Sequence, residues 1–155
     1  MVSSLVATLL LIGSSSVVRP ISPVSGPIIQ HFVAPSCQRC AGHRGVTIAT
    51  RSGQAVVAVL PGTISYVGEV AGLTYVVQVI RPGVKVTYGW LTPQVQMSVG
   101  DEVVSRQVLG WAGEKTYLGV RVGGVYVEPL RYLGLSGTRL RGTGGVVVGR
   151  ARSAR

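Results

Sequence analysis

Short apolar runs, separated by glycine or proline, follow one another along most of the chain. Several of them alternate apolar and polar positions, and in residues 74–80 β-branched side chains dominate, with Gln78 as the polar interruption. No window shows a convincing helical period, and turn signals recur about every 8–12 residues. The pattern predicts an all-β fold, a sandwich or barrel of short strands. These strands are expected at residues 45–49, 55–60, 63–67, 74–80, 84–88, 102–104, 118–122 and 125–127.

The N-terminal segment differs from the rest, because no charged side chain precedes Arg19. An apolar centre at residues 5–12 is followed by Gly13 and three serines, which is typical of a secretory signal with cleavage after Ser16. An uncleaved membrane anchor is one alternative, since about 17 apolar residues suffice to cross a bilayer. A buried strand or helix is another. We expect residues 1–19 to be a signal peptide or an anchor that exports the protein.

Residues 20–134 form the predicted β domain, and residues 135–155 a basic, flexible tail with five arginines. Fifteen Lys and Arg against five Asp and Glu give a net charge of +10, which favours acidic partners such as wall polymers, anionic lipid or nucleic acid. The chain has one phenylalanine and no strand in which aromatic and basic residues alternate, so nucleic acid is not the expected partner. A basic nucleic-acid-binding β-protein is kept as an alternative.

Two cysteines and a histidine stand close together, as Cys37-x-x-Cys40-x-x-His43. With His31 they would supply four ligands for a structural zinc. The competing interpretation is a Cys37–Cys40 disulfide, or idle thiols, and export to an oxidising compartment favours the disulfide. Redox activity is a third interpretation, although no βαβ pattern surrounds the motif. A single Cys-x-x-Cys motif leaves these alternatives open.

Five segments of the chain follow one another in a specific order and spacing. They read "PVSGPIIQHF" (23–32), "GHRGVTIATRSGQAVVAVLPGTISYVG" (42–68), "VTYGWL" (86–91), "VGDEVVSRQVLGWAG" (99–113) and "YLGVRVGGVYVEPLRYL" (117–133). Each alone is a weak signal, but together they resemble the M23 (lysostaphin/LytM-like) family of secreted zinc peptidases, which cut peptidoglycan cross-bridges. The resemblance covers residues 20–134 and implies a core of short, antiparallel β-strands.

The resemblance assigns five positions of this chain to the metal and catalytic side chains of active members. His43 and Thr47, which a strand places on one face, stand where those enzymes have a His and an Asp ligand of zinc. Lys115 and Tyr117 replace two further histidines, a catalytic one and the third ligand, and Trp90 replaces another histidine. A neutral hydroxyl such as that of Thr47 is a poor substitute for a carboxylate on zinc. Only His43 keeps the family's residue type.

The residue inventory leads to the same expectation. The chain has two histidines, His31 and His43, and a single aspartate, Asp101, in a turn. A catalytic zinc usually takes three protein ligands, an open position and a general base. We therefore expect no metal at the family's site, no other cofactor, and no peptidase activity by the family's mechanism. A peptidase with a metal site rebuilt from Cys37, Cys40 and His43 is the alternative.

The replaced positions suggest a groove that binds without cleaving. Tyr88, Trp90 and Lys115 are the candidate ligand contacts, with Tyr117 beside them, because aromatic rings next to a cation suit sugar or peptide faces and carboxylates. The alternative is that Trp90 and Tyr117 only fill the space of the missing metal. We expect an extracytoplasmic domain that binds peptidoglycan or regulates a cell-wall hydrolase and meets a membrane only through its N-terminal segment.

Overall fold

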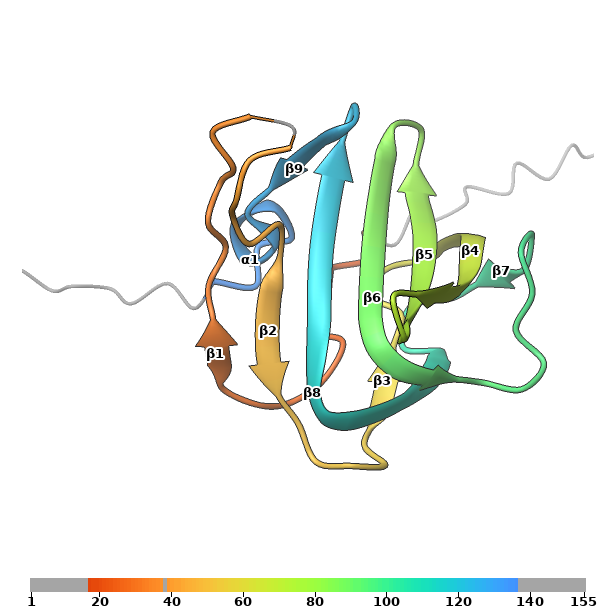
Figure 1. The fold of residues 1–155 in the computed structure, drawn as a ribbon. Coiled ribbons are helices and arrows are strands. Elements are labelled where there is room, and N and C mark those ends of the chain that lie inside the picture. Colours follow the sequence, from red (N-terminus) through yellow and green to blue (C-terminus); the bar gives the residue numbers. More distant parts are fainter. Residues whose placement is uncertain (1–16, 38, 137–155) are drawn as a thin grey trace, which may run out of the picture.

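A computed structural model describes residues 17–37 and 39–136, and it confirms the predicted all-β fold (Figure 1). All pairs of named strands in this part of the chain are antiparallel, and only one short α-helix accompanies them. The elements are β1 (Ile28–Gln30), β2 (Val46–Ala49), β3 (Ala55–Val57), β4 (Gly62–Val70), β5 (Leu73–Arg81), β6 (Val84–Pro93), β7 (Glu102–Val103), β8 (Val108–Val122), β9 (Val125–Val127) and α1 (Pro129–Tyr132).

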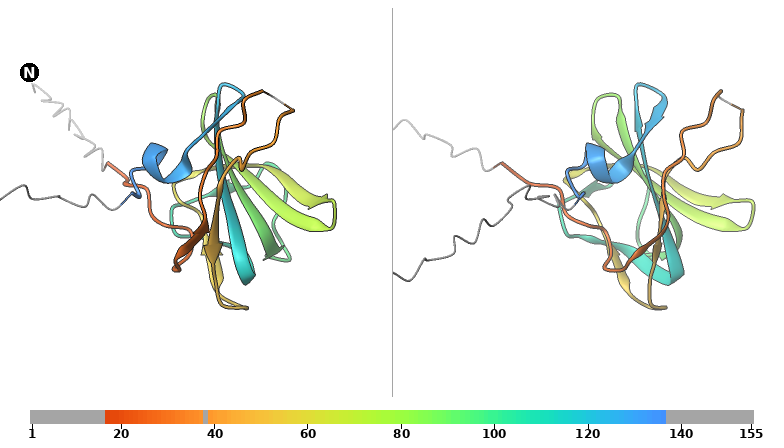
Figure 2. Two further views of the ribbon diagram at one scale, coloured as in Figure 1. Left: turned by 60° about the vertical axis from the view of Figure 1, so that its left-hand side comes forward. Right: turned by 90° about the vertical axis from the view of Figure 1, so that its left-hand side faces the viewer.

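The strands form a single sheet in the order β1-β2-β8-β6-β5-β4-β7. β3 and β9 lie outside this path and both pair with β8, which is therefore the central strand of the fold. Helix α1 lies on one side of the sheet, whereas the hairpin of β4 and β5 projects from the other side (Figure 2). The side from which the hairpin projects carries the candidate site, and the side of α1 carries part of the core.

Strand β8 changes partners partway along its length. Its first half pairs with β3 and with the end of β6, and its second half pairs with β2, β6 and β9. The pairing with β6 jumps from Gly89↔Tyr117 to Leu91↔Ala112, so the intervening residues of β8 leave the β6 ladder. The sequence predicted only residues 118–122 of this strand, because two glycines and a polar triplet interrupt the apolar alternation before them.

The core lies on the face opposite the projecting hairpin. Alternation along the strands points Val76 of β5, Val86 of β6 and Val120 of β8 to this face, and all three are fully buried. Helix α1 packs there through Leu130, and the buried Leu133 follows directly after it. The hydrophobic effect on these side chains fixes which face of the sheet is closed, and so leaves the other face open for a ligand.

Tyr88 belongs to this core, so its prediction as a ligand contact was wrong. Its side chain is fully buried, and its hydroxyl donates to Gln78 Oε1 at 2.7 Å and accepts from the Val59 N–H at 3.0 Å. Gln78 Nε2 donates in turn to the carbonyl of Leu60 at 2.7 Å. Burial raises the pKa of Tyr88 well above its ordinary value of 10.0. The network satisfies polar groups that would otherwise be costly to bury.

A bulge in β6 explains why Tyr88 and Trp90 face opposite ways. Two residues apart in a regular strand, they would share one face, which is what the sequence predicted. The register with β8 shifts between Gly89 and Leu91, and Trp90 adopts a left-handed backbone with a φ of 64°. Such a conformation is uncommon for a large residue, and here it turns the indole to the open face.

The ends of the described chain differ from the prediction in two details. Helix α1 was not predicted; it begins with Pro129, and the carboxylate of Glu128 accepts hydrogen bonds from the N–H groups of Leu130 and Arg131. Leu135, assigned to the tail, packs against the core. Residues 1–16 and 137–155, with most of the predicted signal and tail, lie outside the described residues. No helix within the described part is long and apolar enough to cross a bilayer.

Candidate ligand-binding groove

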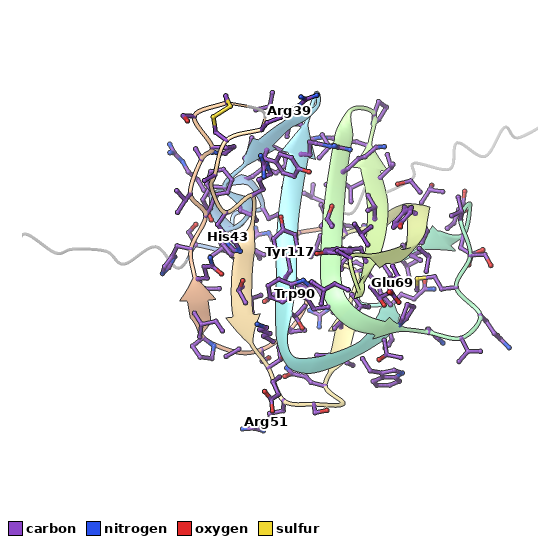
Figure 3. The ribbon with its side chains drawn as sticks, in the orientation of Figure 1. Arg39, His43, Arg51, Glu69, Trp90 and Tyr117 are labelled. Atoms are coloured by element: carbon purple, nitrogen blue, oxygen red, sulfur yellow. A yellow bond between two sulfur atoms is a disulfide. The ribbon has the colours of Figure 1, made fainter. Side chains whose placement is uncertain are left out.

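The open face of the sheet holds a shallow groove of about 420 Å³. Strand register places Tyr75 of β5, Gly89 of β6, Tyr117 of β8 and Thr47 of β2 in one row across its floor. The side chains of His43, Tyr117 and Trp90 lie near one another over the middle of the sheet (Figure 3). The groove is lined by His43, Arg44, Tyr66, Val70, Tyr75, Val77, Thr87, Trp90, Tyr117, Arg121 and Tyr126.

Glycines allow the aromatic rings of the groove to lie down on the sheet. A Cβ atom at Gly45 would stand 2.5 Å from Tyr117 Cζ, and one at Gly119 would stand 2.7 Å from the Tyr117 hydroxyl. A Cβ atom at Gly89 would likewise stand 2.6 Å from the ring of Tyr75. Any larger residue at these positions would lift the rings, so the three glycines and two tyrosines form one packed unit, the aromatic floor.

His43 lies at the end of the groove next to β2 and is held by two hydrogen bonds. Its Nδ1 is 3.1 Å from the carbonyl oxygen of His31, which only accepts, so Nδ1 carries the proton. Its Nε2 is 3.2 Å from Thr47 Oγ1 and, in the neutral ring, accepts from that hydroxyl. The expectation that His43 and Thr47 share a face is confirmed. The ring of Tyr117 meets His43 edge-on, with the ring centres 5.8 Å apart.

Trp90 is half-buried and lies on the side of Tyr117 that faces away from His43 (Figure 3). Its Nε1 donates to the hydroxyl of Tyr75 at 3.2 Å, and its ring lies 5.8 Å from that of Tyr117. Lys115 is exposed at the rim, with its Nζ 5.0 Å from the centre of the indole, a cation–π contact. Trp90 therefore packs on the aromatic floor and still offers part of its ring, with a cation beside it, to the groove.

Tyr117 occupies the centre of the groove as a neutral phenol. Burial raises its pKa above the ordinary value of 10.0, the neighbouring Tyr126 and Tyr75 add to the rise, and Arg44 opposes it. Because a phenol that keeps its proton is a weak metal ligand, the position assigned to the third zinc ligand is chemically a packing and hydrogen-bonding group here.

The side chains around His43 do not fit the zinc of the family. Among the described residues, no three His, Cys, Asp or Glu side chains cluster closely enough to hold a metal. Cys37 and Cys40 form a disulfide with each other, so their sulfurs are not thiolate ligands in this state. What remains at the family's position is one imidazole, a threonine hydroxyl and a phenol, and this donor set lacks the carboxylate and second imidazole that zinc favours.

The sequence did not single out three residues at the far end of the groove. Arg44 and Arg121 both hold their guanidinium groups within 6 Å of the ring centre of Tyr126, at 5.8 and 5.7 Å. Arg121 comes from β8 and Tyr126 from β9, directly opposite each other in the ladder. The only signal for them in the sequence was the alternation on β8, which places Arg121 on the same face as Tyr117.

Solved structures of other proteins share this fold. Csd3 of Helicobacter pylori is 20% identical with a TM-score of 0.66, and the match covers 74% of this chain and 34% of that one, so this chain spans about a third of its length. One chain in the structure of the SpoIIQ–SpoIIIAH complex is 19% identical with a TM-score of 0.62, and the match covers 74% of this chain and 99% of that one. The catalytic domain of lysostaphin from Staphylococcus simulans is 18% identical with a TM-score of 0.60, and the match covers 70% of this chain and 92% of that one.

Sequence comparison assigns the family directly. Among curated protein sequences, none matches this chain significantly. The sequence profile of peptidase family M23, however, matches residues 41–129, more than half of the chain. This stretch runs from just before His43 to the start of α1 and includes all of the aromatic floor. The chain therefore belongs to peptidase family M23.

Proposed function

We propose that this protein is an exported, catalytically inactive M23 domain that binds peptidoglycan through the groove. The aromatic floor carries the proposal, because Tyr117, at the position that the family resemblance assigns to a metal ligand, lies over Gly45 and Gly119. Hydrolysis would need a metal-bound water and a general base, and the side chains around His43 fit neither role. Binding needs only a shaped surface, which the rings provide.

The chemistry of the groove supports a sugar–peptide ligand that carries carboxylates. Trp90, Tyr75 and Tyr117 present aromatic surface suited to sugar and peptide faces. Lys115 adds a cation at the rim, and Asp and Glu are absent from the described residues that line the groove. Peptidoglycan offers both sugar rings and peptide carboxylates.

A pull-down on purified peptidoglycan tests this function. We expect Trp90→Ala and Lys115→Ala each to reduce retention at least about threefold. This is the loss in affinity expected when a cation–π contact and the packing around it are removed. Trp111→Ala is the matched control, because Trp111 is 46% exposed and lines no part of the groove. If the unaltered protein and both groove variants are retained equally and negligibly, the proposed binding function is wrong.

Elemental analysis of protein purified without chelators tests the inactive assignment. We expect far less than one metal ion per chain, and no metal-dependent cleavage of cross-linked muropeptides. A stoichiometric metal that disappears in a His43→Ala variant, together with such cleavage, would favour the rebuilt peptidase instead. The disulfide between Cys37 and Cys40 supports the first outcome, because reduction would have to precede metal binding.

A regulatory role at a cell-wall hydrolase is the second candidate. The observation that favours it is the projecting β4–β5 hairpin (Figure 2), which exposes the apolar side chain of Leu73 outside the groove and those of Tyr66 and Val70 in its wall. In the SpoIIQ–SpoIIIAH complex a protein of similar fold binds a protein partner, so such a domain is compatible with that role. Replacing Leu73, which lines no part of the groove, with serine should then weaken binding to the hydrolase and leave retention on peptidoglycan unchanged.

A further inference from the structure

A cluster of basic side chains stands at the end of the groove where β8 meets β9. Lys85 of β6 and Arg121 of β8 lie directly opposite each other across the ladder, on the groove side of the sheet. Like charges in that relation destabilise a sheet unless something compensates them. Arg121 lines the groove, and with Lys85 and the Gly123–Gly124 turn it also lines the adjoining hollow of about 310 Å³.

Arg44 joins this cluster from the other side. Together with Arg121 and Tyr126 it lines both the groove and a recess of about 920 Å³ that continues beyond it. Its Nη2 donates to the carbonyl of Cys40 at 3.2 Å, so the disulfide-closed loop holds the side chain in place. The groove and the recess therefore adjoin, and Arg44, Arg121 and Tyr126 line the boundary between them.

Among the described residues, no Asp or Glu lines the groove or the adjoining hollow beside Lys85 and Arg121. The residues that line the groove, the recess and the hollow include neither Asp nor Glu. Two of the five acidic residues are used locally: Asp101 accepts from the Ser98 N–H, and Glu128 caps α1. The pair formed by Lys85 and Arg121 is therefore complementary to an anion.

We propose that Lys85 and Arg121 form an anion subsite that holds the C-terminal carboxylate of a peptide lying along the groove. This inference rests on the proposed function and identifies the end of the ligand that the protein recognises. Arginine suits the role because its planar guanidinium binds a carboxylate through two parallel hydrogen bonds. The Gly123–Gly124 turn lines the space beside the same cations.

The dimensions of the sheet agree with a peptide ligand. Arg121 follows Tyr117 by four positions along β8, which is about 13 Å at the rise of a strand, and an extended peptide of about four residues spans the same distance. A peptide that ends at Arg121 would therefore reach the aromatic floor and Trp90 with its preceding residues. A nucleic acid would instead need cations repeated along its whole path, and the centre of this groove is aromatic and apolar.

Calorimetric titration of the full chain with two soluble probes tests the subsite. One probe is a peptidoglycan stem pentapeptide with a free C-terminal carboxylate, and the other is the same peptide with a C-terminal amide. We expect the unaltered protein to bind the free acid about tenfold more tightly than the amide, the usual effect of a charged hydrogen bond. Arg121→Gln and Lys85→Gln should remove most of that difference, while Trp90→Ala should weaken both probes alike.

Arg51→Gln is the matched control, because Arg51 is exposed at the opposite end of the sheet and its loss changes the net charge equally (Figure 3). Equal affinity for acid and amide in the unaltered protein, with Trp90→Ala still weakening both, would overturn the subsite and leave the proposed function standing. Absence of binding to either probe would overturn both. Tighter binding of a single-stranded oligonucleotide that depends on Arg121 would also overturn the inference, in favour of a nucleic-acid ligand.

Discussion

Tyr117 shows how a single replacement depends on residues far away in the sequence. Its ring lies over Gly45 and Gly119, and it contacts His43 and Trp90 on its two sides. The sequence identified the positions of His43, Trp90 and Tyr117, because a family resemblance carries positions well. It did not identify the glycines as the space for a ring, because that space exists only once three strands are aligned.

Tyr88→Phe is expected to lower the free energy of unfolding by about 1–3 kcal/mol, because the N–H of Val59 and Oε1 of Gln78 both lose the Tyr88 hydroxyl inside the core. Urea denaturation measures the change. Tyr66→Phe is the control, because the Tyr66 hydroxyl is exposed and makes only one long hydrogen bond, to the carbonyl of Glu69 at 3.4 Å. If both variants lose equally little stability, the buried network contributes less than we infer.

The buried phenol of Tyr88 also makes stability depend on alkaline pH. Burial raises its pKa in the folded state, so above pH 10 the unfolded chain releases a proton that the folded chain keeps. The contribution of the neutral Tyr88 phenol to the free energy of unfolding is complete below pH 10. Above pH 10 this contribution falls by about 1.4 kcal/mol per pH unit. Denaturation between pH 9 and pH 11 should show a steeper loss for the unaltered protein than for Tyr88→Phe. Parallel curves would contradict this assignment.

At the scale of elements, short regular strands were predicted well and interrupted ones were not. The period-two pattern placed β2, β5 and β9 within a residue or so, because their alternation reflects one buried and one open face. It missed the first half of β8 and the bulge at Trp90, where pairing with two different strands replaces a simple alternation. For this reason the sequence predicted the first part of β6 but not the face of the sheet to which the Tyr88 side chain points.

The disulfide loop between Cys37 and Cys40 gives a prediction for an element. Closing so short a loop stabilises the folded state by about 2 kcal/mol at most, because a short loop has little entropy to lose. We therefore expect a Cys37→Ser/Cys40→Ser variant to stay folded, with a small decrease in the urea midpoint. Thiol titration of the unaltered protein without reductant should detect no free cysteine. Two reactive thiols in freshly purified protein would show that the pair is open.

For the whole molecule, half of the net charge lies outside the described fold. Deleting residues 137–155 removes five arginines and no acidic residue, so the net charge falls from +10 to +5. Non-specific binding to anionic vesicles or DNA should then weaken strongly and lose much of its salt dependence, because both scale with the number of cations. Retention on peptidoglycan should persist, since the groove is intact. Loss of wall binding on deletion would assign that binding to the terminal segment.

Trp90 stands where its fluorescence responds to occupation of the groove. The indole is half-buried, donates to Tyr75 and lies beneath the ammonium of Lys115, so its surroundings change as soon as anything enters the groove. Trp111, the other indole of the chain, is exposed on the far half of β8 and is insensitive to the groove. Intrinsic fluorescence of a Trp111→Phe variant is thus a built-in optical reporter, with which collections of wall fragments can be screened without attaching a dye.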